Sequence, residues 1–324
     1  MIDRRGLMTG ALAGLVLPRM ARAQDNDGKT PRPEVAFRVP EPDPRVAGLV
    51  EQIRQDRLRA DVDALVGLGT RWSEAPGYGT VEDWMETAFA DAGPGGAVTR
   101  QPVAFPSGLT RNNVIWGDPL SGREVILVGA HLDSISEIPG ESAPGANDNG
   151  SGIAAMLEAL RVLQGQAFTR EIVCVAFTGE EQGLIGSAAC AMAAVHEGWP
   201  VDLMLNLDML GYRPPDPAAP FFIEYDRGNA TPANDAAAAA YGALAVELAA
   251  THTTLPIAET DIWESDYMPF EREGVPCIGF YDGGASGTDY HTTGDLPERM
   301  DFDRLEQATR LVVATLATAA ELAG

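Results

Sequence analysis

Positive charge is scarce in this sequence. Acidic residues outnumber basic ones 47 to 23, which leaves a formal net charge of −24 at pH 7. A surface this negative repels phosphate backbones and anionic lipid headgroups, so we expect no nucleic-acid partner. The excess of acid by itself predicts solubility, and an attraction for cationic substrates is the alternative.

Cysteine is scarce as well. The chain has only Cys174, Cys190 and Cys277, and an odd number excludes a fully paired disulfide framework. Cys174 and Cys277 lie in apolar, strand-like segments, which predicts buried and unreactive thiols. A single disulfide in an oxidising compartment is the alternative, because pairing cannot be read from a sequence.

Long apolar runs are absent beyond the N-terminus, so we expect no membrane span in the mature chain. The first 23 residues have the pattern of an export signal: Arg4 and Arg5 precede an apolar stretch through Leu17, and residues 21–23 form an A-x-A cleavage site. The paired arginines favour the twin-arginine route, which carries folded proteins to a periplasmic or secreted location. An ordinary Sec signal is the alternative.

The rest of the chain is long enough for one large domain, since 45% of the 324 residues are hydrophobic. Residues 24–44 are rich in proline and charge and lack apolar periodicity, which predicts a Pro-rich leader. We expect residues 45–324 to form a single domain. The sequence gives no sign of its oligomeric state.

The apolar pattern predicts an α/β fold. Spacing typical of helices predicts one helix over 46–66 and a second over 81–92 ahead of the first strand. Continuous apolar strands then alternate with helices, which favours a three-layer αβα sandwich around a mostly parallel, mixed central sheet. The predicted strands are 98–105, 113–116, 125–129, 172–177, 203–207, 221–225 and 277–281. The later helices are 152–163, 186–195, 234–250 and 302–322.

Polar side chains follow three of these buried strands. His131 comes after the first, Glu180 and Glu181 after the next, and Asp208 after the third. Ligands of open α/β sheets bind at the carboxyl ends of the strands, so these side chains should converge. Asp148, in a glycine-rich turn that opens a helix, could be presented at the same edge.

His291 follows the last predicted strand through a glycine-rich loop and completes a set of two histidines and three carboxylates. A set without cysteine suits zinc or a similar divalent ion in a catalytic site, because structural zinc sites favour thiolates. One carboxylate shared between two metals would leave room for a bridging water, the nucleophile of two-metal hydrolases. The predicted metal ligands are His131, Asp148, Glu181, Asp208 and His291.

Two acidic residues beside these ligands have candidate roles of their own. Glu180, directly before the ligand Glu181, could point at the water instead of the metal and act as general base. Asp133, two residues after His131, lies on the same side of an extended chain and could orient the imidazole.

Together these motifs resemble the metal-site motifs of metallopeptidase family 28, and they occur in the family's order. That family holds zinc aminopeptidases, glutamate carboxypeptidase relatives and glutaminyl cyclases. The likeness covers roughly residues 45–324, with further matches at Gly69-Thr70-Arg71 and Ser265-Asp266-Tyr267. The five motifs are His131-Leu132-Asp133-Ser134, Asn147-Asp148-Asn149-Gly150-Ser151-Gly152, Thr178-Gly179-Glu180-Glu181, Asn206-Leu207-Asp208-Met209 and Tyr290-His291-Thr292.

The resemblance implies two zinc ions per chain. It implies that His131 and Asp208 hold one ion and that Glu181 and His291 hold the other. Asp148 would bridge the two ions.

The resemblance also implies that Glu180 is the base and that Asp133 and Asp266 are outer-shell carboxylates. The family usually has histidine where Tyr267 stands, and Tyr267 could still donate to a developing oxyanion. Trp263 and Tyr281 are further possible substrate contacts, with core packing as the alternative.

The function we expect is that of an exported aminopeptidase, which hydrolyses the N-terminal peptide bond of peptide substrates. A glutaminyl cyclase or a carboxypeptidase-like hydrolase on the same fold is the alternative, and a non-catalytic binding module is a further one. The glycines at 145, 150 and 152 do not predict a nucleotide site, because no Lys-Ser or Lys-Thr pair follows them. No serine lies in a G-x-S-x-G turn, which argues against serine hydrolysis.

Overall fold

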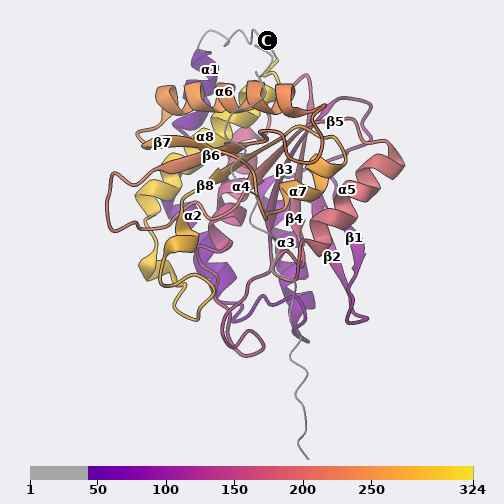
Figure 1. Ribbon diagram of the computed structural model, residues 1–324, viewed down its shortest axis with the longest axis vertical. Helices are drawn as coiled ribbons and strands as arrows, with labels where there is room; N and C mark the ends of the chain where they lie inside the picture. Colours follow the sequence, from indigo (N-terminus) through magenta and orange to yellow (C-terminus); the bar gives the residue numbers. More distant parts are fainter. Residues whose placement is uncertain (1–42, 324) are drawn as a thin grey trace, which may run out of the picture. The chain divides into compact units, whose positions relative to one another are not determined.

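The computed structural model describes residues 43–323 (Figure 1). The expected export signal and all but the last two residues of the expected leader lie outside these residues. Among the residues described, no helix is both long and apolar enough to cross a membrane.

One mixed sheet of eight strands organises the described chain, in the order β1-β2-β4-β3-β5-β8-β6-β7. Strands β3, β4, β5 and β8 run parallel at its centre, and the antiparallel neighbours β2 and β6 flank them. The strands are β1 Val98–Ala104, β2 Thr110–Trp116, β3 Val125–His131, β4 Glu171–Phe177, β5 Val201–Leu207, β6 Phe221–Tyr225, β7 Ile257–Thr260 and β8 Cys277–Tyr281.

Helices cover both faces of the sheet, which confirms the expected αβα sandwich (Figure 1). Alternate strand residues face opposite layers: Ile126 and Val128 of β3 pack in one core, and Leu127 packs in the other. Helices α3, α4, α6 and α8 belong to the first core, with α1 and α2 against α4 and α8, whereas α5 and α7 belong to the second. The helices are α1 Pro44–Val50, α2 Gln55–Val66, α3 Tyr78–Ala92, α4 Gly150–Leu163, α5 Ile185–Glu197, α6 Asp235–His252, α7 Tyr267–Arg272 and α8 Phe302–Ala319, with 3₁₀ turns at Gly284–Ser286 and Pro297–Arg299.

The prediction of a single helix over 46–66 is wrong, because this segment forms two helices, α1 and α2. Arg54 has extended backbone angles, φ −123° and ψ 111°, and its amide donates to Oε1 of Glu158 at 2.7 Å. The Arg57 guanidinium also donates to Glu158, which is fully buried in α4. The buried carboxylate therefore takes a hydrogen bond that a continuous helix would have kept within itself.

All three cysteines are buried and unpaired, as expected. Cys174 of β4 packs in the first core, and Cys190 of α5 and Cys277 of β8 pack in the second. Burial raises the pKa of each thiol, so none is a reactive thiolate at neutral pH.

Candidate metal centre

The first group of predicted ligands lies at the carboxyl ends of β3 and β5, where the parallel strands present side chains to one edge. His131 is the last residue of β3, and Asp208 directly follows β5. Nε2 of His131 lies 3.4 Å from Oδ1 of Asp208 and 3.2 Å from Oδ1 of Asp148. These three side chains could hold one ion between them.

The second group shares Asp148 with the first. Nε2 of His291 lies 3.2 Å from Oδ2 of Asp148 and 3.1 Å from Oε2 of Glu181. The two oxygens of Asp148 therefore face two different ligand groups, and the three side chains could hold a second ion. His291 itself adopts left-handed backbone angles with φ 56°, an uncommon conformation for a residue other than glycine and one found at functional sites.

The oxygens around this centre suit a cation. Oε1 of Glu181 and Oδ1 of Asp208 are buried, and neither accepts a hydrogen bond from the part of the chain that the structure describes. A buried oxygen without a partner is costly unless an ion or water satisfies it. The donor set has two imidazoles and no thiolate, which fits zinc in a catalytic site.

The ionisation of these groups points the same way. Burial alone would raise the pKa of Asp148, yet the imidazoles of His131 and His291 hold it below its usual range. Burial would lower the pKa of His291, but Asp148 and Glu181 raise it to about 10. Burial, with the charge of Asp148, raises the pKa of Glu181 to about 7. The site therefore has an excess of negative charge that favours bound cations.

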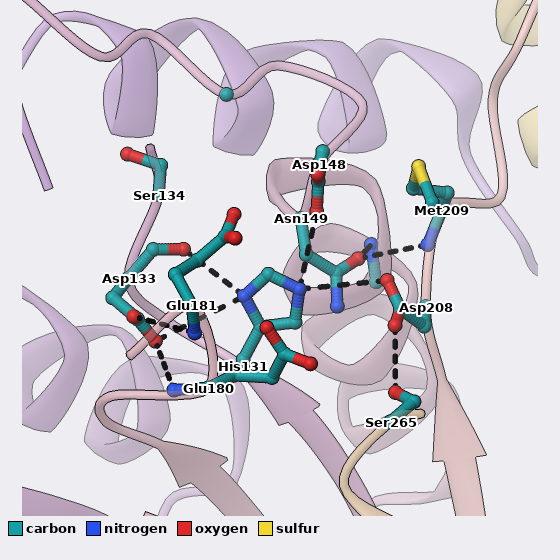
Figure 2. Close-up of polar contacts among 12 residues, drawn as sticks. His131, Asp133, Ser134, Asp148, Asn149, Glu180, Glu181, Asp208, Met209 and Ser265 are labelled. Atoms are coloured by element: carbon teal, nitrogen blue, oxygen red, sulfur yellow. Dashed lines mark hydrogen bonds and ion pairs between the residues drawn. The ribbon is translucent and has the colours of Figure 1, made fainter. Parts of the chain in front are cut away.

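Asp133 holds the Glu180–Glu181 segment in place (Figure 2). Its Oδ1 accepts the Glu180 amide at 3.1 Å, and its Oδ2 accepts the Glu181 amide at 3.3 Å. Glu180 lies beside His131 and Glu181, within reach of a shared ion. Burial raises the pKa of Glu180 well above its usual value, with His131 opposing the shift.

The His131 imidazole lies nearer to the backbone carbonyl of Asp133 than to its carboxylate, which was expected to orient it. Nδ1 of His131 lies 3.1 Å from the backbone carbonyl of Asp133, and 3.9 Å from its Oδ1. A proton on Nδ1 donated to that carbonyl leaves Nε2 free to bind a metal, so the main chain sets the tautomer.

Asp295 is a positioning residue that the sequence did not single out. Its Oδ1 and Oδ2 each lie 2.9 Å from a backbone amide, of Asn147 and Asp148 respectively. It thus fixes the turn that carries the shared carboxylate. Its only sequence signal is its place four residues after His291, in the segment His-Thr-Thr-Gly-Asp.

Asp208 is oriented by Ser265 of the loop before α7, which is itself held by Asn206 of β5. Ser265 donates its hydroxyl to Oδ2 of Asp208 at 2.6 Å (Figure 2). Asn206 in turn donates to the Ser265 oxygen at 2.8 Å. Asp266, the next residue, is fully buried, and burial raises its pKa to about 7 while His131 opposes the shift. Its charge interacts with those of the candidate ligands His131 and Asp208, so the outer-shell role stays a prediction.

A cavity of about 140 Å³ opens beside the ligands. The three expected substrate contacts, Trp263, Tyr267 and Tyr281, all line it, and Trp263 is 55% exposed. The Tyr267 hydroxyl donates to Glu224 at 2.7 Å and accepts the amide of Trp263 at 3.1 Å. Its proton is therefore already engaged, which argues against the expected donation to an oxyanion.

Sequence comparison places this geometry in a known group of enzymes. Residues 113–316 match the model of peptidase family M28. This matched segment contains all five expected metal ligands. The chain belongs to peptidase family M28. A leucine aminopeptidase 1 from Pyrenophora tritici-repentis is 30% identical over 86% of this chain and 73% of its own length. The expected family is confirmed, and the M28 relatives support a zinc aminopeptidase.

Solved structures agree on the fold. LapB from Legionella pneumophila gives a TM-score of 0.75 at 22% identity, over 89% of this chain and 77% of that one. Glutaminyl cyclase from Porphyromonas gingivalis gives a TM-score of 0.69 at 22% identity. The match covers 82% of this chain and 99% of the cyclase. BSAP, a zinc aminopeptidase from Bacillus subtilis, is 28% identical and gives a TM-score of 0.55. The match covers 66% of this chain and 51% of BSAP. The M28 fold is thus common to aminopeptidases and a cyclase.

Proposed function

We propose that this M28 protein is an exported aminopeptidase with two zinc ions, which hydrolyses the N-terminal peptide bond of peptides. The observation that carries the proposal is the position of Asp148, whose two oxygens each lie 3.2 Å from a different histidine. The relatives named as leucine aminopeptidases support the reaction class.

In this proposal His131 and Asp208 would hold one zinc, Glu181 and His291 would hold the other, and Asp148 would be shared between them. When bound, zinc supplies Lewis acidity for the scissile carbonyl and lowers the pKa of water. Two buried oxygens without hydrogen bonds, on Glu181 and Asp208, support this assignment.

Glu180 serves as general base. It lines the cavity, and Asp133 fixes its backbone amide at 3.1 Å. Its carboxylate takes a proton from the attacking water and then passes it to the leaving amine. Burial raises its pKa, which matches its basicity more closely to neutral operating conditions.

The lining of the cavity supports action at a free amino terminus. Among the described residues it carries several carboxylates, including Glu180 and Asp208, and no lysine or arginine. Bound zinc would offset the charge of the ligand carboxylates, but the lining also contains carboxylates that are not ligands, and these attract a cationic α-ammonium group. Within the described chain, the lining offers no lysine or arginine that could pair with the α-carboxylate of a C-terminal residue. This charge favours the aminopeptidase over the carboxypeptidase.

The test is hydrolysis of aminoacyl-p-nitroanilides by the purified mature protein, with chelator, with added zinc, and with a Glu180→Ala variant. We expect release that needs metal and falls at least 100-fold in the variant, because proton transfer contributes about 10²–10⁴-fold. Because the variant keeps all five ligands, elemental analysis should still find two zinc ions per chain. This measurement is the control that the loss of activity does not come from loss of metal. No release from a fully loaded wild-type protein would refute the proposal, and cyclisation of an N-terminal glutamine would then identify a cyclase.

The export part of the proposal rests on residues 1–23, with Arg4 and Arg5 ahead of an apolar stretch and an Ala-Arg-Ala site. We expect the protein recovered outside the cytoplasm to begin near Gln24. Replacing both arginines by lysine should retain the precursor inside the cell if the twin-arginine route is used. Unchanged export of that variant would refute the route, and an intact N-terminus would refute cleavage.

A further inference from the structure

Glu224 is a buried carboxyl in the cavity that the proposed chemistry does not use. It lies on β6, is 3% exposed and lines the cavity beside the candidate ligands. Its Oε2 accepts the Tyr267 hydroxyl at 2.7 Å. Within residues 43–323, no hydrogen bond reaches its Oε1 and no cationic side chain pairs with it. One carboxyl oxygen is therefore available to a ligand.

The strand register places Glu224 on the floor of the cavity. Gly279 of β8 pairs with Asn206 of β5 on one side and with Glu224 on the other. Two strand spacings separate Asn206 from Glu224, or roughly 10 Å. Asp208, one of the candidate ligands, lies two residues beyond Asn206, so Glu224 lies deeper in the sheet than the metal centre.

Gly279 keeps this floor open. A Cβ atom at this position would lie 2.5 Å from Cε1 of Tyr267 and 2.9 Å from Oε2 of Glu224. Any larger residue would displace the hydrogen-bonded pair. The missing side chain between two strands thus makes room for the carboxyl group that faces the cavity.

The walls between the metal centre and Glu224 suit a long, flexible side chain. Met209, Trp263 and Tyr281 line the cavity and offer thioether and aromatic surface. Lysine and arginine pack their methylene stems on such surfaces while the charged end reaches a polar partner. Glu264 also lines the cavity, but it is exposed, so solvent screens its charge.

We propose that Glu224 is a specificity-determining residue, which selects substrates whose N-terminal residue is lysine or arginine by pairing with the cationic end of that side chain. The inference rests on the proposed aminopeptidase function and narrows its substrate class. An apolar side chain leaves the buried carboxyl unpaired, and sites that contain an unmatched polar group discriminate strongly against such substrates.

The first measurement compares kcat/KM of the zinc-loaded mature enzyme for lysyl- and norleucyl-p-nitroanilide. The two side chains have the same four-carbon stem and differ in the terminal ammonium group. We expect kcat/KM for the lysyl substrate to be at least ten times that for the norleucyl substrate. The arginyl substrate should have a kcat/KM slightly below that of the lysyl substrate. A lysyl-to-norleucyl ratio of one or less would overturn the inference while leaving the aminopeptidase intact. Hydrolysis of neither substrate would instead count against the proposed function.

The second measurement uses Glu224→Gln, which can still accept the Tyr267 hydroxyl but carries no charge. We expect the lysyl-to-norleucyl ratio to fall at least tenfold. The matched control is Glu264→Gln, which removes the same charge from the exposed part of the lining and should change the ratio less than threefold. An unchanged ratio in Glu224→Gln, or an equal fall in Glu264→Gln, would overturn the assignment. If Glu224→Gln does not fold, the wild-type ratio decides.

Discussion

Three buried carboxyls around the cavity differ in what their oxygens contact. Asp133 accepts two backbone amides, Asp148 faces two imidazoles, and Glu224 accepts one tyrosine hydroxyl. The two imidazoles hold the pKa of Asp148 below its usual range, whereas burial raises the pKa of Asp133 against its two amides and that of Glu224 against its single hydroxyl partner. Burial accordingly raises the pKa of Glu224 to about 8, and the nearby charges of Asp208 and Asp261 reinforce the shift.

This difference predicts a pH-dependent substrate preference. The Glu224 carboxyl is mostly neutral at pH 6 and becomes ionised as the pH approaches 8, while a lysine side chain, with a pKa of about 10.4, stays charged. The lysyl-to-norleucyl ratio of kcat/KM should therefore rise between pH 6 and pH 8.5. Zinc in the adjacent site would lower the pKa of Glu224. The ratio would then rise at a lower pH, but it would still increase with pH.

The Glu224→Gln variant is the control for that profile, because an amide does not titrate. Its ratio should be flat over the same range, since the α-amino groups of the two substrates titrate alike and cancel. A wild-type ratio that falls with pH, or a rise that persists in the variant, would contradict the assignment of this titration to Glu224.

At the scale of the elements, one buried arginine links the segments that carry two candidate ligands. Arg71, with 0% exposure, donates to the carbonyl oxygens of Leu132, Pro144 and Gly145 at 2.9, 2.6 and 2.9 Å. Leu132 follows His131 at the end of β3, and Gly145 opens the turn that carries Asp148. The planar guanidinium suits this fixed array of three acceptors better than an ammonium would.

The sequence predicted those site residues that follow a strand of regular apolar pattern. His131, Glu181 and Asp208 are of this kind, because the end of a parallel strand is also the place where ligands bind. Glu224 could not be predicted in this way, since it lies within the strand Phe221–Tyr225 and its role depends on Gly279 and Tyr267 of other elements. Pairing between distant segments leaves no local pattern.

Two short elements and one helix break are also absent from the predictions, because local apolar spacing does not indicate them. Strand β7 has 4 residues and helix α7 has 6, which is too short for an apolar period to stand out. The break between α1 and α2 depends on Glu158, about one hundred positions away. Apolar spacing predicts the layers of the sandwich but not these contacts.

At the scale of the whole molecule, the chain combines a net charge of −24 with a carboxylate-rich centre. Self-repulsion of this kind destabilises a folded protein, and bound cations relieve it locally. A ligand that binds only the folded state adds about 2.7 kcal/mol to the free energy of unfolding at a concentration 100 times its Kd. Metal loading should therefore contribute substantially to the stability of this protein.

We accordingly expect chelation to lower the Tm of the mature protein by about 5 °C or more, since 1 kcal/mol corresponds to about 2 °C in a domain of this size. Calorimetry before and after removal of the metal, with the zinc content measured in both samples, gives the shift. Returning zinc should restore the Tm, whereas magnesium should not, because a site with two imidazoles favours zinc over a hard cation that prefers oxygen ligands. An unchanged Tm in fully stripped protein would mean that the carboxylates are already accommodated without metal, by shared protons rather than by ions.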